Sequence, residues 1–153
     1  MKKIAILLVL LFSAIALSAC SEDADAYSML LEFKDLYSLD GTVYSPAVRE
    51  GEEGYIGEDL TSRIYLIYGA PPENFAVLLN THVDSGAECG VFVCEGGEEM
   101  AKVSEMCRER ISLLSGEESG VIIRSGSVIF YSTLEDKDRA ELLWQRVLRG
   151  VNE

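Results

Sequence analysis

The alternation of hydrophobic and polar residues is clearest in the second half of the chain, where it predicts strands. The stretch "NFAVLLNTHV" places Phe75, Val77 and Leu79 on one side, as in a half-buried strand. A turn follows at "VDSGAE", and "CGVFVCE" reads as the next strand. From Glu98 to Leu114 the apolar positions then change to three- and four-residue steps, which predicts an amphipathic helix; they are Met100, Val103, Cys107, Ile111 and Leu114.

The same order of elements is predicted again toward the C-terminus. The stretch "VIIRSGSVIFYS" indicates two short strands joined at Ser125-Gly126, where glycine accepts the positive φ of a tight hairpin turn. A last helix is expected from Leu134 to Arg149, with Thr133 as its N-cap. Acidic residues suit the positive end of that helix; they are Glu135, Asp136 and Asp138.

The first half gives weaker patterns. A helical segment is expected from about Tyr27 to Leu39, followed by an exposed connection rich in Gly and Glu. Residues Asp59 to Tyr68 suit a short helix or a strand before the Pro71-Pro72 pair. The predicted fold class is therefore α+β, a two-layer sandwich with an antiparallel sheet of about four strands. Its second half has the order ββαββα, its helices lie on one face, and an N-terminal helical segment precedes it.

The first twenty residues form a separate segment. Met1-Lys2-Lys3 precedes an uncharged run from Ile4 to Leu17, which is too short for the roughly 20 residues of a membrane-spanning helix. The sequence Leu17-Ser18-Ala19-Cys20 resembles the lipobox of bacterial lipoproteins. The resemblance implies cleavage before Cys20 and acylation of its thiol, while an ordinary signal peptide with no role for Cys20 is the alternative.

These features predict three parts of the chain. Residues 1–19 are a lipoprotein signal peptide, residues 20–26 a lipid-anchored acidic tether, and residues 27–153 a single α+β domain. Two acyl chains on one cysteine supply the double hydrophobic signal that stable anchoring requires. The expected location is the cell membrane, on its extracytoplasmic face.

The charge of the mature chain is strongly negative. Lys2 and Lys3 account for two of the 13 basic residues, so a chain cut before Cys20 keeps 11 of them against 26 acidic residues, a formal charge of −15. Such a surface repels nucleic acid and anionic headgroups and excludes a nucleic-acid role. It attracts cations or a basic partner, although solvation of a secreted domain is the simpler explanation.

Three cysteines remain after Cys20, namely Cys89, Cys94 and Cys107, so at least one thiol is free. Cys89 and Cys94 are five residues apart on a predicted strand and are expected to point to opposite faces. Without a CxxC or CxxH spacing, no zinc site and no other cofactor is predicted. Cys107 lies on the apolar stripe of the helix, and a bridge from it to Cys89 or Cys94 stays open.

Several stretches together resemble a family of small bacterial lipoproteins, mainly from clostridia and their relatives, that is defined as a domain of unknown function. They are the turn Ser85-Gly86-Ala87-Glu88 before "CGVFVCE", Arg110 within the long helix, and the hairpin Val121 to Thr133 before the last helix. The similarity extends over about Asp59 to Leu148. It implies a fold class and a location, and no activity.

Candidate chemistry is sparse. His82, the single histidine, could activate the thiol of Cys89 or Cys94, although no oxyanion-hole or nucleophile-elbow pattern accompanies it. Glu88 could pair with Arg110 on the covering helix, either as a structural ion pair or as part of a recognition surface.

Two further groups of side chains could form surface features. Tyr55, Tyr65 and Tyr68 could form an aromatic patch for a partner or a glycan, or could pack the helix onto the sheet. Acidic clusters occur around Glu50 to Asp59 and at Glu117-Glu118; they lack the EF-hand pattern and are expected to be solvated loops.

The function expected from the sequence is a non-enzymatic, membrane-anchored lipoprotein that presents one domain for binding or envelope interaction. Its partners would be the membrane, through Cys20, and an envelope protein that the sequence does not identify. Two alternatives stay open: a small thiol-dependent enzyme that uses His82, and an accessory lipoprotein of an envelope transporter with a groove lined by tyrosines.

Overall fold

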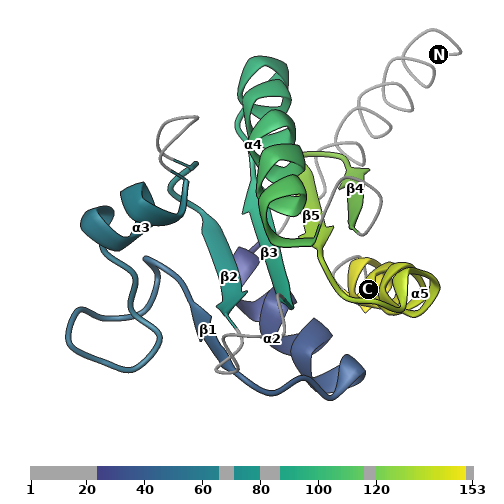
Figure 1. Ribbon diagram of the computed structural model, residues 1–153. Coiled ribbons are helices and arrows are strands. Elements are labelled where there is room, and N and C mark those ends of the chain that lie inside the picture. The colour runs from purple at the N-terminus through teal and green to yellow at the C-terminus, as the bar shows by residue number, and fades with distance from the viewer. Residues whose placement is uncertain (1–23, 66–70, 80–86, 116–119, 151–153) are drawn as a thin grey trace, which may run out of the picture.

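The computed structural model describes residues 24–65, 71–79, 87–115 and 120–150 of the chain. Its sheet has five strands, all paired antiparallel, in the order β1-β2-β3-β5-β4 (Figure 1). The helices and strands are, in chain order, α2 (Ala26–Tyr37), β1 (Thr42–Tyr44), α3 (Glu58–Ile64), β2 (Phe75–Leu79), β3 (Glu88–Val93), α4 (Gly97–Ser115), β4 (Val121–Ser125), β5 (Val128–Ser132) and α5 (Lys137–Gly150). The predicted α+β class is confirmed. The sheet has one strand more than the approximately four expected, namely β1.

The central strands β3 and β5 are buried on both faces, and the helices divide between these faces. On β3, Cys89 and Val91 belong to a core cluster with residues of α2 and α5. Phe92 belongs to a second cluster with residues of α4 and with Tyr65, which follows α3. The prediction that all helices lie on one face was therefore wrong. The physical reason is that β3 and β5 are apolar at nearly every position, so a helix layer on one side would leave apolar side chains in water.

The core on the α2 and α5 face is aromatic. The ring of Trp144 on α5 stacks on Phe130 with centroids 4.4 Å apart, and Phe33 on α2 lies 4.8 Å from Phe130. All three side chains are 0 % exposed. The inward face of α5 is formed by Ala140, Leu143, Trp144 and Val147, which are all buried.

The start of α5 differs from the prediction. The helix begins at Lys137, and the carboxylate of Asp136 accepts a hydrogen bond from the backbone N–H of Arg139 at 3.0 Å, as an N-cap does. Thr133 lies before the helix, and its hydroxyl instead accepts from the N–H of Glu88 at 2.7 Å. Thr133 is thus held beside β3, and its prediction as the cap was wrong.

The first described residues are already part of the fold. Asp25 caps α2 by accepting from the N–H groups of Tyr27 and Ser28. The side chain of Asn74, just before β2, donates to the carbonyl of Ala24 at 2.8 Å and accepts from the N–H of Ala26 at 3.0 Å. The domain therefore includes residues 24–26, which the sequence assigned to the tether.

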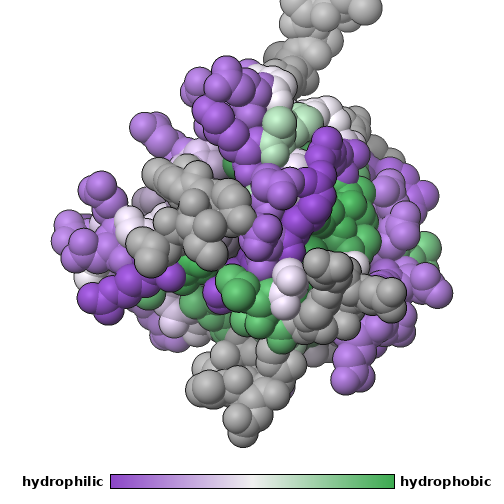
Figure 2. Space-filling view, turned by 45° about the horizontal axis from the view of Figure 1, so that its top comes forward, coloured by the Kyte–Doolittle hydropathy of each residue, from purple (hydrophilic) through white to green (hydrophobic). Residues whose placement is uncertain are grey.

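The outer surface of α4 is hydrophilic, and hydrophobic area is visible beside it (Figure 2). In the described part of the chain, no helix has the length and apolar character needed to cross a membrane. The predicted signal peptide and Cys20 lie outside the described residues.

Candidate functional site

A buried ion pair joins the sheet to α4. The guanidinium of Arg110 donates from Nε to one carboxylate oxygen of Glu88 at 2.9 Å and from Nη2 to the other at 2.6 Å. This two-point geometry is the strongest form of arginine–carboxylate pairing. The Glu88 side chain is 5 % exposed and that of Arg110 is 21 % exposed. The predicted Glu88–Arg110 pair is confirmed, and it has the character of a structural ion pair.

Two tyrosines extend this pair into a network. The hydroxyl of Tyr131 on β5 donates to the Glu88 carboxylate, and the hydroxyl of Tyr65 lies 3.2 Å from that of Tyr131. Both tyrosines are buried, at 0 % and 3 % exposure. We call these four residues, Glu88, Arg110, Tyr131 and Tyr65, the Glu88 network. It connects β3, α4, β5 and the end of α3.

The electrostatics of the Glu88 network keep its tyrosines neutral. Burial raises the pKa of Tyr131 and that of Tyr65 well above their ordinary value, and the nearby charge of Glu88 raises both pKa values further. The hydrogen bonds to Glu88 raise the pKa of Arg110, against the opposing effect of burial. The buried carboxylate of Glu88 thus has both a positively charged partner and a neutral hydroxyl donor, and a buried charge needs such hydrogen-bond partners.

Local sequence explains how the residues meet. Glu88, Gly90 and Phe92 alternate onto the α4 face of β3, because successive side chains of a strand point to opposite faces. A Cβ on Gly90 would overlap the ring of Tyr131, so glycine is what lets this ring approach the backbone of β3 so closely. Register places Gly90 directly opposite Tyr131.

Of the three tyrosines predicted to form an aromatic patch, the two in the described residues do not form one on the surface. Tyr65 is buried in the Glu88 network, so its prediction as a surface recognition residue was wrong and packing of helix onto sheet is what the structure shows. Glu88 is likewise interior. Tyr55 is half-buried beside Gly57, and Tyr68 lies outside the described residues.

The three thiols are buried and unpaired. Cys89, Cys94 and Cys107 are 0 %, 4 % and 0 % exposed, and none forms a disulfide. As predicted, Cys89 and Cys94 face opposite sides of the sheet, and Cys107 lies in the apolar contact of α4. Burial raises the pKa of Cys89 to about 12 and that of Cys94 to about 11, so both are thiols at neutral pH. His82 lies outside the described residues.

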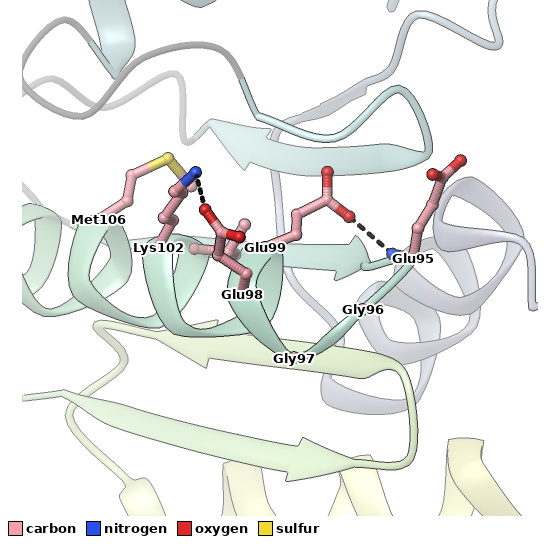
Figure 3. Close-up of a pocket in the computed structure, with 8 residues that line it drawn as sticks. Glu95, Gly96, Gly97, Glu98, Glu99, Lys102 and Met106 are labelled. Carbon is pink, nitrogen blue, oxygen red and sulfur yellow. Dashed lines mark hydrogen bonds and ion pairs between the residues drawn. The ribbon is translucent and has the colours of Figure 1, made fainter.

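A hollow lies at the start of α4, on the surface (Figure 3). Glu99 accepts from the backbone N–H of Glu95 at 2.6 Å, and Glu98 pairs with Lys102 at 2.8 Å. These contacts cap and support the first turns of the helix, so Glu98, Glu99 and Lys102 have structural partners there.

Acidic side chains do not gather into a metal-binding group in the described ranges of the chain. No three His, Cys, Asp or Glu side chains there lie close enough to hold a metal ion. The acidic residues from Glu50 to Asp59 are exposed, and Glu117-Glu118 lies outside the described residues.

Sequence reasoning found Glu88 and Arg110 and missed Tyr131. The missed signal was Gly90, a glycine within an apolar strand, which often marks a close approach by another group. No protein-family model, no curated protein and no solved structure matches this chain.

Proposed function

We propose that this protein is a lipoprotein attached to the extracytoplasmic face of the cell membrane through Cys20, and that its domain acts by binding an envelope partner. The observation that carries the proposal is the lipobox-like Leu17-Ser18-Ala19-Cys20, which a folded domain follows from Ala24 onward. Attachment at this point leaves the whole described fold outside the bilayer. The resemblance to small clostridial-type lipoproteins agrees with this proposal.

Three features support a binding role over a thiol-dependent reaction. The thiols of Cys89 and Cys94 are buried and protonated, whereas a nucleophilic cysteine needs thiolate character and access to substrate. In the Glu88 network the carboxylate and both tyrosines are buried, and the donors to the carboxylate are already engaged. The formal charge of −15 after cleavage favours a basic partner over an acidic one.

Mass spectrometry of the native protein tests the anchor. We expect the membrane fraction to contain a chain that begins at Cys20 and carries acyl mass, with a diacylglycerol on the thiol. The matched variant Cys20→Ala should keep its leader and incorporate no fatty-acid label. A wild-type chain with an intact leader, or an N-terminus without acyl mass, would overturn the proposal.

Cross-linking in intact cells tests the binding role. A lysine- and carboxylate-reactive cross-linker should join the wild-type protein to a basic envelope protein, and the yield should fall for Cys20→Ala. If the yield of cross-linked protein is unchanged when the cross-linking is done in high salt, the partner is not held by electrostatic attraction, because salt screens exposed charges.

A further inference from the structure

The N-terminal segment joins the folded domain at a defined residue, Ala24. Asn74 holds the backbone on both sides of Asp25 through its bonds to Ala24 and Ala26, and Asp25 itself caps α2. From Ala24 onward the chain is therefore part of the rigid fold. Any pull or restraint from Cys20 reaches the domain at Ala24.

The distance from Cys20 to that point is short. Three residues separate Cys20 from Ala24, and a fully extended chain spans at most about 3.5 Å per residue, so the two Cα atoms lie within about 14 Å of each other. A domain of this size has a radius of gyration near 14 Å, which corresponds to a sphere of about 18 Å radius.

This length limits how far the domain can roll on a membrane. A point on a sphere of ~18 Å radius rises 14 Å above the supporting plane when it is rotated by about 75–80° from the contact point. Ala24 therefore stays in the half of the domain that faces the bilayer. The opposite side stays in the half that faces away.

Backbone hydrogen bonds identify the end of the sheet that lies next to Ala24. The carbonyl of Asn74 accepts from the N–H of Val93 at 2.9 Å, and the N–H of Cys94 donates to the carbonyl of Ser127 at 2.9 Å. The start of β2, the end of β3 and the β4–β5 turn thus share one end with Ala24. In Figure 1 the arrowheads of β2 and β5 point away from this end.

The other end of the sheet is one strand length away. Thr42 pairs with Leu79, Leu79 with Glu88, and Cys89 with Ser132 there. The connection from α2 to β1 brings exposed Asp40 to the same end. A strand rises about 3.3 Å per residue, so the six residues of β3 separate the two ends by roughly 17–20 Å.

We propose that the sheet end at Asn74 and Ser127 faces the bilayer, and that the end at Asp40 and Glu88 faces outward. This inference rests on the proposed acylation of Cys20. The membrane-facing end carries exposed acidic residues, among them Glu73, Glu95 and Glu98. The surface that comes forward in Figure 2 shows hydrophilic residues together with a hydrophobic area beside them. The bilayer is thus held against this end by the short tether, with no attraction between the domain and anionic headgroups.

Depth-dependent quenching on vesicles tests the orientation. The full acylated protein is purified from membranes and placed in vesicles of phosphatidylcholine with 20 % phosphatidylglycerol that contain a lipid with a nitroxide on its headgroup. A fluorophore is attached at Ser127→Cys or at Asp40→Cys, both exposed positions, under native conditions in which Cys89, Cys94 and Cys107 are buried. We expect the headgroup nitroxide to quench the label at 127 at least threefold more strongly than the label at 40.

Two controls make the outcome specific. Both labels should be quenched equally by a water-soluble quencher in detergent, which shows that neither is intrinsically shielded. A variant with twelve Gly and Ser residues inserted after Asp23 should lose the difference between the two labels, because its tether no longer restricts rolling.

The possible results separate this inference from the proposed function. An acylated, vesicle-bound protein in which both labels are quenched equally, or label 40 more strongly, overturns the orientation and leaves the anchor in place. A protein without acyl mass that does not stay with the vesicles overturns both.

Discussion

The Glu88 network gives the sharpest prediction about stability. In Glu88→Gln the two-point pairing of Arg110 with a carboxylate is replaced by hydrogen bonding to a single uncharged amide oxygen, and the guanidinium keeps a positive charge with no counter-charge. Removal of one partner from a buried pair costs about 3–5 kcal/mol. Arg110 is 21 % exposed and can turn partly to water, so we expect a loss of about 2–3 kcal/mol in the free energy of unfolding.

The converse substitution Arg110→Met leaves the Glu88 carboxylate with the hydroxyl of Tyr131 as its remaining side-chain donor among the described contacts. We expect a loss of about 3 kcal/mol, because the carboxylate is more deeply buried than the guanidinium. The double variant should lose clearly less than the two single losses together, with a coupling of about 2 kcal/mol, because it buries neither unpaired charge.

Urea unfolding followed by circular dichroism measures all four free energies of this cycle. A shift of 2–3 kcal/mol corresponds to roughly 6–12 °C in the melting temperature of a domain of this size, so thermal scans give an independent check. Glu98→Gln, which breaks the exposed pair with Lys102, is the matched control and should leave stability unchanged within error. If the single losses simply add within about 0.5 kcal/mol, the two side chains are not coupled and the network as described is refuted.

Three further predictions concern other parts of the fold. The pKa of Cys89 is raised to about 12 from an ordinary value near 9, so the thiol loses its proton at lower pH in the unfolded state than in the folded state. The free energy of unfolding should therefore fall as pH rises above 9, by up to about 1.4 kcal/mol per pH unit for this thiol. Denaturation from pH 8 to 11 should show a shallower fall for Cys89→Ala, and identical slopes would contradict the buried thiol. Gly90→Ala should cost about 2–4 kcal/mol because its methyl group overlaps the ring of Tyr131, and Gly96→Ala, which meets nothing within 4 Å, is the control in the same urea assay. Asn74→Ala removes the hydrogen bonds that hold the backbone at Ala24 and Ala26, so we expect a loss of about 1–2 kcal/mol in the free energy of unfolding and faster amide exchange at Ala26. Unchanged amide exchange at Ala26 would exclude this role of Asn74.

Local periodicity predicted most elements of the fold, and long-range packing explains what it missed. The alternation at Phe75, Val77 and Leu79 and the helical steps from Met100 to Ile111 each depend on neighbouring residues, so the sequence displays them directly. The strand β2 was predicted to be half-buried, but Ala76 and Leu78 on its other side are buried as well, in the cluster with α2. The two-sided burial of β3 also depends on α2, which lies more than fifty residues earlier and covers the Cys89 face. The predicted order of strands and helices in the second half of the chain does not show that a helix from the first half covers the other face of the sheet.

The candidate site shows the same division. The pair of Glu88 and Arg110 was predicted because Glu88 precedes an apolar strand and Arg110 lies on the helix expected to cover it. Tyr131 and Tyr65 reach Glu88 from 43 and 23 residues away in the sequence, through the β3–β5 register and the end of α3. Only the assembled sheet brings their hydroxyl groups together.

The hydrogen bonds of Asn74 to Ala24 and Ala26 also determine where a mechanical load on the preceding chain would enter the domain. From Ala24 the covalent chain leads into α2, and Asn74 links the same point to the start of β2, an interior strand with neighbours on both sides. A pull from the N-terminal side would therefore act first on a helix packed against the sheet and on an interior strand, and not on the border strands β1 and β4.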